Sequence, residues 1–456
     1  MRRVVKVSRI RIIITIIVVV LTTLLTGCTG KEANEIAYVV ALGIDSTDDD
    51  NYKITIQYAN TTQISGGASE SGGKAGSEIV DNVTIEAPNI YAGVGLANNI
   101  VSKSFSMSHA KLIVFSKEMA EKGVKDMIET LVRSEEIRPD VFIAVANTTA
   151  NDYLTSVNPE MEVNPAQYYQ LIYQKNQLVG IPDGQLREFF TGLYTDNYDS
   201  ILPVAGVIEG SGGNSQNDDK GQSKDSQNEG SEGSSESLDS FESKSSNEKD
   251  ENEKEKDAEK NTSKYEYDIK NYVGGETAIE KKNKAEAIGA AVFEKDKMVG
   301  ELGEVETEIC KMLKGDYTYS YLTYYNNDTP DIPITVKTTQ QKKPKYKIDT
   351  DKKTVDIELY IESDLYSLPA DYNVENKIED FERDVANYTS SACTEFINNF
   401  TKKYNSDILK LNEKIKYKFL TNNQYNWFKK NVGWSEYKFS VCTNFKVRRT
   451  GLIVRE

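Results

Sequence analysis

The chain has 456 residues, of which 38% are hydrophobic and 28% are charged, and its formal net charge is −16. A single hydrophobic core rarely extends beyond about 250 residues, so the length predicts more than one domain. The acidic balance argues against nucleic acid as a partner, because binding to a phosphate backbone depends on clustered basic residues.

The N-terminus has the parts of a bacterial export signal. An apolar stretch from Ile12 to Leu25, shorter than the roughly 20 residues of a bilayer span, follows a basic start. The residues Leu25-Thr26-Gly27-Cys28 then resemble the lipoprotein pattern of an aliphatic residue, two small residues and a cysteine that accepts a diacylglycerol. We therefore predict a signal peptide over residues 1–27 and a lipid anchor on Cys28. An uncleaved anchor helix is the alternative. The basic residues of the start are Arg2, Arg3, Lys6, Arg9 and Arg11.

Residues 28–150 are predicted to form an N-terminal α/β domain. Strands are expected at 37–46 and 52–60, where Ile54 and Ile56 alternate with polar residues and indicate one buried face. Apolar residues at helical spacing predict further helices, and β-rich runs predict further strands. Helices that alternate with strands indicate an α/β or α+β arrangement. The further helices are expected at 89–101 and 120–131, and the further strands at 111–116 and 141–146.

A middle domain is expected over 151–315, interrupted by an acidic insert at 209–283. Residues 209–264 hold sixteen acidic and eight basic residues, a net charge of −8, and almost no apolar side chains. Such a segment cannot offset the entropy lost on ordering, so we predict that it is disordered. The runs on either side, 201–209 and 285–302, both favour strands. If they pair in one sheet, the insert is an enlarged loop within a domain.

The C-terminal domain, 316–456, is predicted to be α+β. Strands are expected at 333–340, 353–363 and 439–447, where apolar and polar residues alternate. Between them, apolar residues recur every three or four positions from Ile378 to Phe400, which predicts a long amphipathic helix across one face of a mostly antiparallel sheet.

The usual combinations of catalytic residues are absent from the sequence. His109 is the one histidine, so an HExxH zinc site cannot form, and we interpret this residue as a turn or strand-edge residue. Gly93 lies within a helical pattern and does not belong to a dinucleotide fingerprint, and Glu135 and Glu136 are interpreted as surface residues. We expect no enzyme activity, no cofactor and no metal. The tyrosine-rich run 317–325 favours half-buried strand positions over a binding surface.

The cysteines after Cys28 do not form a disulfide or metal pattern. Cys310 and Cys393 fall in expected helices and are predicted to be small core residues, while Cys442 lies in the last expected strand. A single disulfide among the three is the alternative.

Several ordered segments resemble the Ger(x)C spore germination lipoproteins. After the lipoprotein motif come NEIAYVVALGIDSTDDDNYKITIQYAN and SMSHAKLIVFSKEMAEKGVKDMIETLVRSEEIRPDVFIAVAN, which resemble the N-terminal region of that family. AAVFEKDKMVGELGEVETEICKMLKGD resembles its middle segment, and KKYNSDILKLNEKIKYKF with FKVRRTGLI its last helix and strand. Thr29-Gly30 stands where members often have Trp-Asp, and the insert is unusually long.

The resemblance implies an α+β protein of three domains without catalytic function. It implies a C subunit of a germinant receptor, lipid-anchored on the outer face of the spore inner membrane, which works with integral membrane A and B subunits in sensing small nutrients. Among the known functional features, only the lipidation of Cys28 maps to this chain by motif. A solute-binding lipoprotein that captures a ligand itself is the alternative function, and a secreted hydrolase is disfavoured by the missing catalytic groups.

Overall fold

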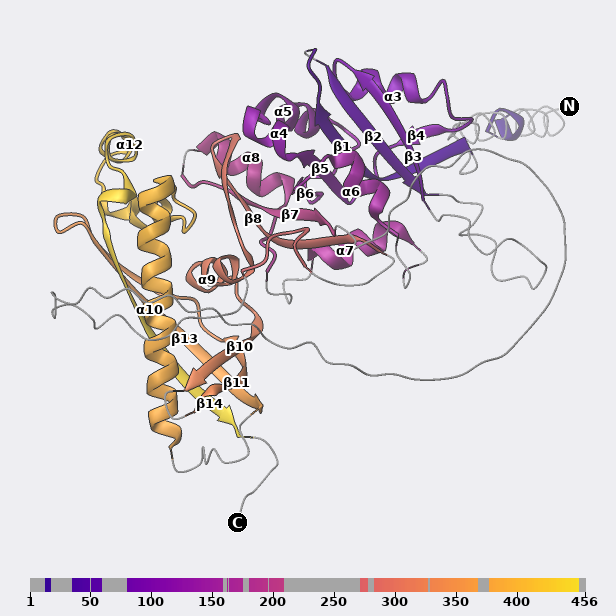
Figure 1. Cartoon of the computed structure of the whole chain (residues 1–456). Helices are drawn as coiled ribbons and strands as arrows, with labels where there is room; N and C mark the ends of the chain where they lie inside the picture. Colours follow the sequence, from indigo (N-terminus) through magenta and orange to yellow (C-terminus); the bar gives the residue numbers. More distant parts are fainter. Residues whose placement is uncertain are drawn as a thin grey trace, which may run out of the picture. The chain divides into compact units, whose positions relative to one another are not determined.

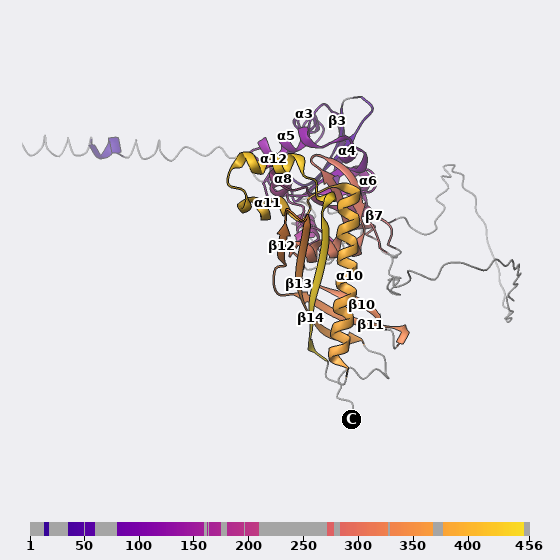
Figure 2. The same cartoon turned by 90° about the vertical axis from the view of Figure 1, so that its left-hand side faces the viewer.

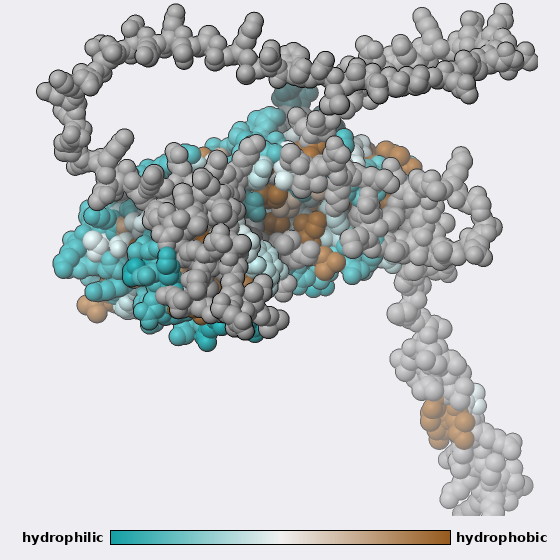
Figure 3. Space-filling view, turned by 60° about the horizontal axis from the view of Figure 1, so that its bottom comes forward, coloured by the Kyte–Doolittle hydropathy of each residue, from teal (hydrophilic) through white to brown (hydrophobic). Residues whose placement is uncertain are grey.

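The computed structural model describes residues 13–17, 35–49, 51–59, 80–158, 162, 164–174, 180–195, 197–208, 271–277, 283–326, 329–367 and 377–450. These residues form a mixed α+β protein with two β-sheets, called sheet 1 and sheet 2 (Figure 1). The α+β class predicted from the sequence is confirmed. In the N-terminal segment, residues 13–17 are helical and their four isoleucines are exposed, as the hydrophobic colour in Figure 3 shows.

Sheet 1 has nine strands in the order β3-β2-β1-β5-β6-β7-β8-β9, with β4 paired to β1. The central strands β1, β5, β6 and β7 are parallel, and the outer strands are antiparallel. The strands are β1 (Ile36–Ser46), β2 (Tyr52–Ala59), β3 (Val80–Ala87), β4 (Ser104–Ser106), β5 (Leu112–Ser116), β6 (Phe142–Ala146), β7 (Ile201–Val207), β8 (Ala285–Glu294) and β9 (Lys297–Leu302).

Helices cover both faces of sheet 1, and the strand residues divide between the faces with a period of two. Ile113 and Phe115 of β5 pack with one group of helices, whereas Leu112 and Val114 pack with the other group. The first group is α3 (Ile90–Ala97), α4 (Lys117–Lys122), α5 (Lys125–Arg133) and α8 (Leu186–Thr195), and the second is α6 (Ala150–Ser156) and α7 (Pro165–Gln174).

The helix expected over 120–131 is two helices, and this prediction is corrected. Gly123 lies between α4 and α5 with φ of 124°, a conformation that L side chains rarely adopt. The next residue, Val124, donates its backbone N–H to Asp296 O at 3.0 Å, in the turn between β8 and β9. The helix therefore ends at this glycine, and the chain contacts the neighbouring β8–β9 hairpin.

The expected pairing of the runs around the acidic insert is confirmed. β7 and β8 are antiparallel neighbours, with Ile201 opposite Val292 and Val207 opposite Ala285. The insert therefore leaves and re-enters the same sheet. Sheet 1 thus contains strands from two expected domains, the N-terminal domain at 28–150 and the middle domain at 151–315. The boundary predicted at residue 150 therefore crosses one continuous core.

Most of the segment expected to be disordered, 209–283, lies outside the described residues. Residues 271–277 and Asn283 are described and are hydrogen-bonded to the fold. Gly274 N donates to Ile288 O at 3.0 Å, and Glu304 N donates to Tyr272 O at 2.8 Å. The expected insert is therefore shorter at its C-terminal end.

Sheet 2 is formed by the C-terminal part of the chain. Its order is β10-β11-β13-β12, and β14 pairs with β13. β10 to β13 are antiparallel, but β14 runs parallel to β13, because the long helix α10 carries the chain back between them. The strands are β10 (Tyr319–Asn326), β11 (Thr329–Gln340), β12 (Lys345–Asp349), β13 (Thr354–Ser367) and β14 (Lys438–Arg449).

The long helix α10 (Ile378–Tyr404) lies along sheet 2, as Figure 2 shows. Its apolar stripe is buried, which confirms the prediction from the sequence that the stripe faces the core: Phe381 and Val385 are 0% exposed, Phe400 3% and Phe396 9%. The remaining elements are α9 (Glu304–Lys314), α11 (Leu411–Ile415), η2 (Lys416–Lys418), α12 (Asn422–Asn431) and η3 (Trp434–Glu436).

Polar side chains of α10 also cover the edge of β14. Asn398 Oδ1 accepts from Phe439 N at 3.1 Å, and Thr394 Oγ1 accepts from Val441 N at 3.0 Å. Ser390 and Glu382 continue this pattern toward the end of the strand. Four helical residues rise about 6 Å and two strand residues about 6.6 Å, so side chains at every fourth position meet alternate backbone N–H groups.

Candidate functional site at the junction of the two sheets

The structure places the residues singled out by the sequence at separate positions. Cys28 lies outside the described residues, so its lipidation stays a prediction. His109 is exposed in the turn before β5, where Nδ1 lies 3.0 Å from Ser108 Oγ and the ring meets Tyr38 edge-on at 4.8 Å. Its interpretation as a turn residue is confirmed.

A hydrogen bond accounts for Glu136 of the acidic pair, and close packing accounts for Gly93. Glu135 and Glu136 are exposed, and Glu136 Oε2 accepts from Met107 N at 2.6 Å. Gly93 lies inside α3, where an added Cβ would be 2.7 Å from Ile54 Cδ1. Close packing of α3 on β2 therefore accounts for this glycine.

The cysteines follow their predicted environments, whereas the tyrosines of 317–325 only partly occupy the expected half-buried strand positions: Tyr319 of β10 is half-buried. Cys310 and Cys393 are free and buried, as predicted, and Cys442 is free and exposed. In the tyrosine-rich run, Tyr317 is buried and Tyr321 is 52% exposed. The side chains of 324 and 325 lie outside the described part.

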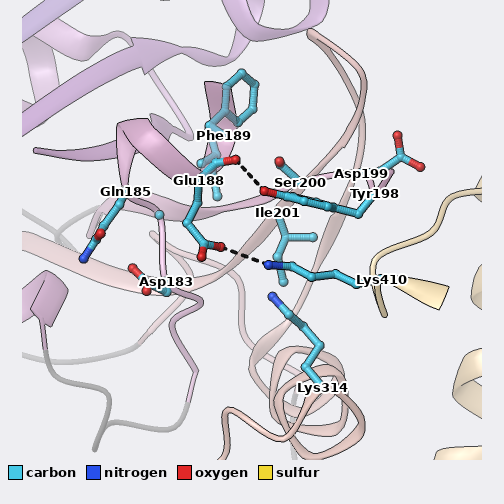
Figure 4. A pocket seen from close by; sticks show the side chains of 12 residues that line it. Asp183, Gln185, Glu188, Phe189, Tyr198, Asp199, Ser200, Ile201, Lys314 and Lys410 are labelled. Carbon is cyan, nitrogen blue, oxygen red and sulfur yellow. Dashed lines mark hydrogen bonds and ion pairs between the residues drawn. The ribbon is translucent and has the colours of Figure 1, made fainter. Parts of the chain in front are cut away.

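A cavity lies where sheet 1 meets the C-terminal part of the chain. The cavity has a volume of about 730 Å³. The turn after α8, the β8–β9 turn, the loop after α10 and the segment around α12 line it, with Tyr198, Asp199, Lys295, Asp407, Lys429 and Trp434 among the lining residues. A smaller pocket shares Tyr198, Asp199 and Ser200 with it (Figure 4).

Two aspartates join the walls of this cavity. Asp407 N donates to Asp199 Oδ2 at 2.9 Å, and Asp199 N donates to Asp407 O at 3.2 Å. The Asp407 carboxyl group accepts from Leu411 N at 2.7 Å and from Asn412 N at 2.8 Å, at the start of α11. Burial raises the pKa of Asp407 to about 7, although these two N–H groups oppose the shift.

Lysines of the C-terminal part reach across to sheet 1 and α8. Lys410 Nζ lies 3.4 Å from Glu188 Oε2 and 4.3 Å from the centre of the Tyr198 ring, whose hydroxyl donates to Glu188 O at 2.9 Å (Figure 4). Lys429 Nζ donates to Thr195 O at 3.2 Å and to Asn197 Oδ1 at 3.2 Å. These polar groups hold the two parts of the protein together.

The lining can still hold a small polar molecule. The lining carries side chains of both charge signs and one aromatic wall, Trp434. Trp434 is held in place by a hydrogen bond from its Nε1 to Asn412 Oδ1 at 3.2 Å. Within the described ranges, His, Cys, Asp and Glu side chains form no group that could hold a metal ion. The one sequence signal for this site is Asp407 before the apolar pair Ile408-Leu409, a helix-start pattern.

Two family models match the chain. The model described as "Spore germination protein N-terminal domain" matches residues 30–207, and the model described as "Spore germination B3/ GerAC like, C-terminal" matches residues 288–451. The two ranges take in more than half of the chain. The chain belongs to the Ger(x)C family of spore germination proteins. The family resemblance inferred from the sequence is thereby confirmed.

Three Ger(x)C relatives come from Bacillus subtilis (strain 168). Spore germination protein KC is 28% identical over 163 residues, which are 33% of this chain and 40% of that protein. Putative spore germination protein YfkR is 29% identical over 145 residues, or 32% and 37%. Spore germination protein B3 is 26% identical over 148 residues, or 30% and 36%. The chain thus spans about two fifths of the length of the curated relatives it matches.

The solved structure of the GerBC protein covers 89% of this chain and 96% of its own chain, with 15% identity and a TM-score of 0.47. Among the described residues of this Ger(x)C protein, no helix combines the length and apolar content that crossing a bilayer requires.

Proposed function

We propose that this chain is the lipid-anchored C subunit of a spore germinant receptor and acts with integral membrane A and B subunits in nutrient-triggered germination. Its place is the outer face of the spore inner membrane. The observation that carries the proposal is the match of both family models, one on each side of the insert, behind a lipoprotein motif that ends at Cys28. The role is non-enzymatic: the folded body contacts its membrane partners.

The position of Cys28 supports an anchor that keeps the folded body close to the membrane. β1 begins at Ile36, eight residues after Cys28. Eight extended residues span at most about 29 Å, so a lipid on Cys28 limits the distance between β1 and the bilayer to that length. Two or three acyl chains, at about 0.8 kcal/mol per buried CH₂ group, make the attachment effectively permanent.

Replacing Cys28 by Ala tests the anchor. We expect the Cys28→Ala protein to be soluble or to remain an unprocessed precursor, and we expect spores that carry it to germinate poorly. Fractionation of spores, with the wild-type chain as the reference, measures both form and location. Undiminished retention of a fully processed Cys28→Ala protein in the inner membrane would contradict lipid anchoring.

The junction cavity favours a second candidate function, the capture of a small solute. A volume of about 730 Å³ suits an amino acid, sugar or nucleoside, and Trp434 in its wall offers a fluorescence signal. Titration of the protein with L-alanine, glucose and inosine tests this function. A saturable change that a Trp434→Phe variant lacks supports solute capture, and unchanged emission with all three contradicts it for these solutes.

A further inference from the structure

The segment from η2 to α12 exposes large apolar side chains on its outer side. Leu420 is 94% exposed, Tyr417 81% and Trp427 64%. Leu420 lies just before α12, and Trp427 lies within this helix, seven residues later. In Figures 1 and 2, α12 lies near the C-terminal end of α10.

The inner side of the same segment is tightly packed, so the exposed residues belong to a supported structure. Tyr425 and Phe428 of α12 are 5% and 6% exposed. The Phe419 ring lies 5.1 Å from the Phe428 ring, and Phe428 lies 6.1 Å from Trp434. The packing of Phe419 and Phe428 thus holds their neighbours Leu420 and Trp427 facing outward.

The charge around these residues is opposite to that of the whole chain. Residues 410–432 contain six lysines and one acidic residue, Glu413, a net charge of +5 in a chain of −16. Lys416, Lys418 and Lys430 are exposed, and Lys418 Nζ also donates to Ile348 O. We call Tyr417, Leu420 and Trp427, together with these three lysines, the α12 patch.

We propose that the α12 patch docks onto an anionic lipid surface. Trp and Tyr favour the boundary between headgroups and acyl chains, and a leucine beside them can enter the apolar layer. Each lysine near an anionic membrane contributes about 1 kcal/mol, or roughly a fivefold gain in affinity. The patch supplies both kinds of contact within one short segment.

A bilayer is a more suitable occupant than an acidic protein because the anchor already brings it within reach. This inference rests on the proposed function, in which the lipid on Cys28 keeps the folded body beside the membrane. A second contact on the folded body would fix the orientation of the protein on the bilayer. The anchor alone leaves that orientation free.

The two tryptophans of the chain make a direct test available, since Trp427 is 64% and Trp434 4% exposed. In the full chain with Trp434→Phe, Trp427 is the single tryptophan. We expect its emission to shift to shorter wavelength, and to be quenched by acyl-brominated lipids, with phosphatidylglycerol-containing vesicles but not with pure phosphatidylcholine vesicles. High salt should reverse the effect, because it screens the lysines.

Matched variants distinguish an effect of the α12 patch from a general effect of positive charge. Replacing Lys416, Lys418 and Lys430 by Gln should reduce the affinity for anionic vesicles, as measured by this quenching, at least tenfold. Replacing three exposed lysines of the sheet 1 region should leave it unchanged: Lys53, Lys125 and Lys284. Flotation with neutral vesicles reports the N-terminal attachment separately, so failure of the anchor and failure of the patch are distinguishable. Unchanged Trp427 emission on anionic vesicles with which the chain floats would overturn the proposal, and so would capture by an acidic protein without any response to lipid.

Discussion

In sheet 1, all five residues of β5 and all five of β6 are buried, whereas β14 of sheet 2 alternates strictly between buried and exposed positions up to Phe445. Helices cover both faces of the first sheet, as parallel strands require. Sheet 2 has α10 on one face and exposed tyrosines elsewhere, such as Tyr321 and Tyr366 at 52% and 59%. One sheet is therefore an enclosed core, and the other keeps an exposed surface.

The two sheets also protect their edges differently. The outer strands of sheet 1 are antiparallel hairpins, and the acidic insert leaves between two of its paired strands. In sheet 2 the side chains of α10 occupy backbone donors along β14, so a second chain cannot add there. The four predictions that follow test these differences.

The largest effect is expected from truncating a large side chain in the core beneath α10. Phe396→Ala should lower the free energy of unfolding by roughly 3 to 5 kcal/mol, because a large buried side chain leaves a cavity. Denaturant melts of the purified protein measure this. The exposed Tyr366→Ala is the control and should change stability by less than about 0.5 kcal/mol.

An unchanged midpoint for Phe396→Ala, together with failed receptor assembly in spores, would make α10 an interface element. The contrast between an enclosed sheet and a one-sided sheet would then be wrong for sheet 2.

The junction between the two regions should depend on pH through Asp407. The folded pKa of about 7 lies above the ordinary value of 3.8, so the folded protein binds the proton more tightly than the unfolded chain. The free energy of unfolding should therefore fall by about 1 to 3 kcal/mol as pH rises from about 4 to about 7. Thermal melts at several pH values measure the slope.

Asp407→Asn should reduce the slope, since an amide does not titrate in this range, while Glu308, whose pKa burial also raises to about 7, keeps part of it. Asp126→Asn, at an exposed position of α5, should keep the wild-type slope. Equal slopes for Asp407→Asn and the wild type would show that other groups cause the pH dependence.

A smaller effect is expected at the edge of β14. Asn398 both accepts from Phe439 N and donates to Phe439 O, at 3.1 and 2.9 Å. Asn398→Ala should cost about 1 to 2 kcal/mol, because both backbone groups lose their partner. The neighbouring exposed Asn399→Ala is the matched control, and equal stability of the two variants in denaturant melts would contradict the role of this ladder.

The smallest effect is expected from deleting residues 212–262. β7 and β8 pair on both sides of the insert, and halving a loop changes its closure entropy by only about 0.6 kcal/mol. Melting of the purified deletion variant should differ little from that of the intact protein. A drop of many degrees would show that the insert contributes packing.

The sequence was most informative where one periodicity decides the structure. The runs at 112–115 and 142–146 are continuously apolar and lie in buried parallel strands, and the stripe from Ile378 to Phe400 lies in α10. Local patterns could not reveal that β14 is parallel to β13, because this depends on the path of the chain around α10. The break at Gly123 was also missed, since apolar spacing continues across it.

The junction cavity was not predictable from the sequence. Asp199 and Asp407 are 208 residues apart, and their backbone contacts arise only when both parts have folded. The lipoprotein motif at 25–28, in contrast, is a local pattern, so the sequence alone suffices to predict an anchor there.

The most direct test of the account is isolation of the intact, lipid-anchored chain from spore inner membranes in mild detergent. We predict that two integral membrane proteins, the A and B subunits, co-purify with it in a constant ratio, and that both are lost when the membranes come from Cys28→Ala spores. Complete extraction of the chain without any membrane protein in constant ratio would contradict its role as a receptor subunit.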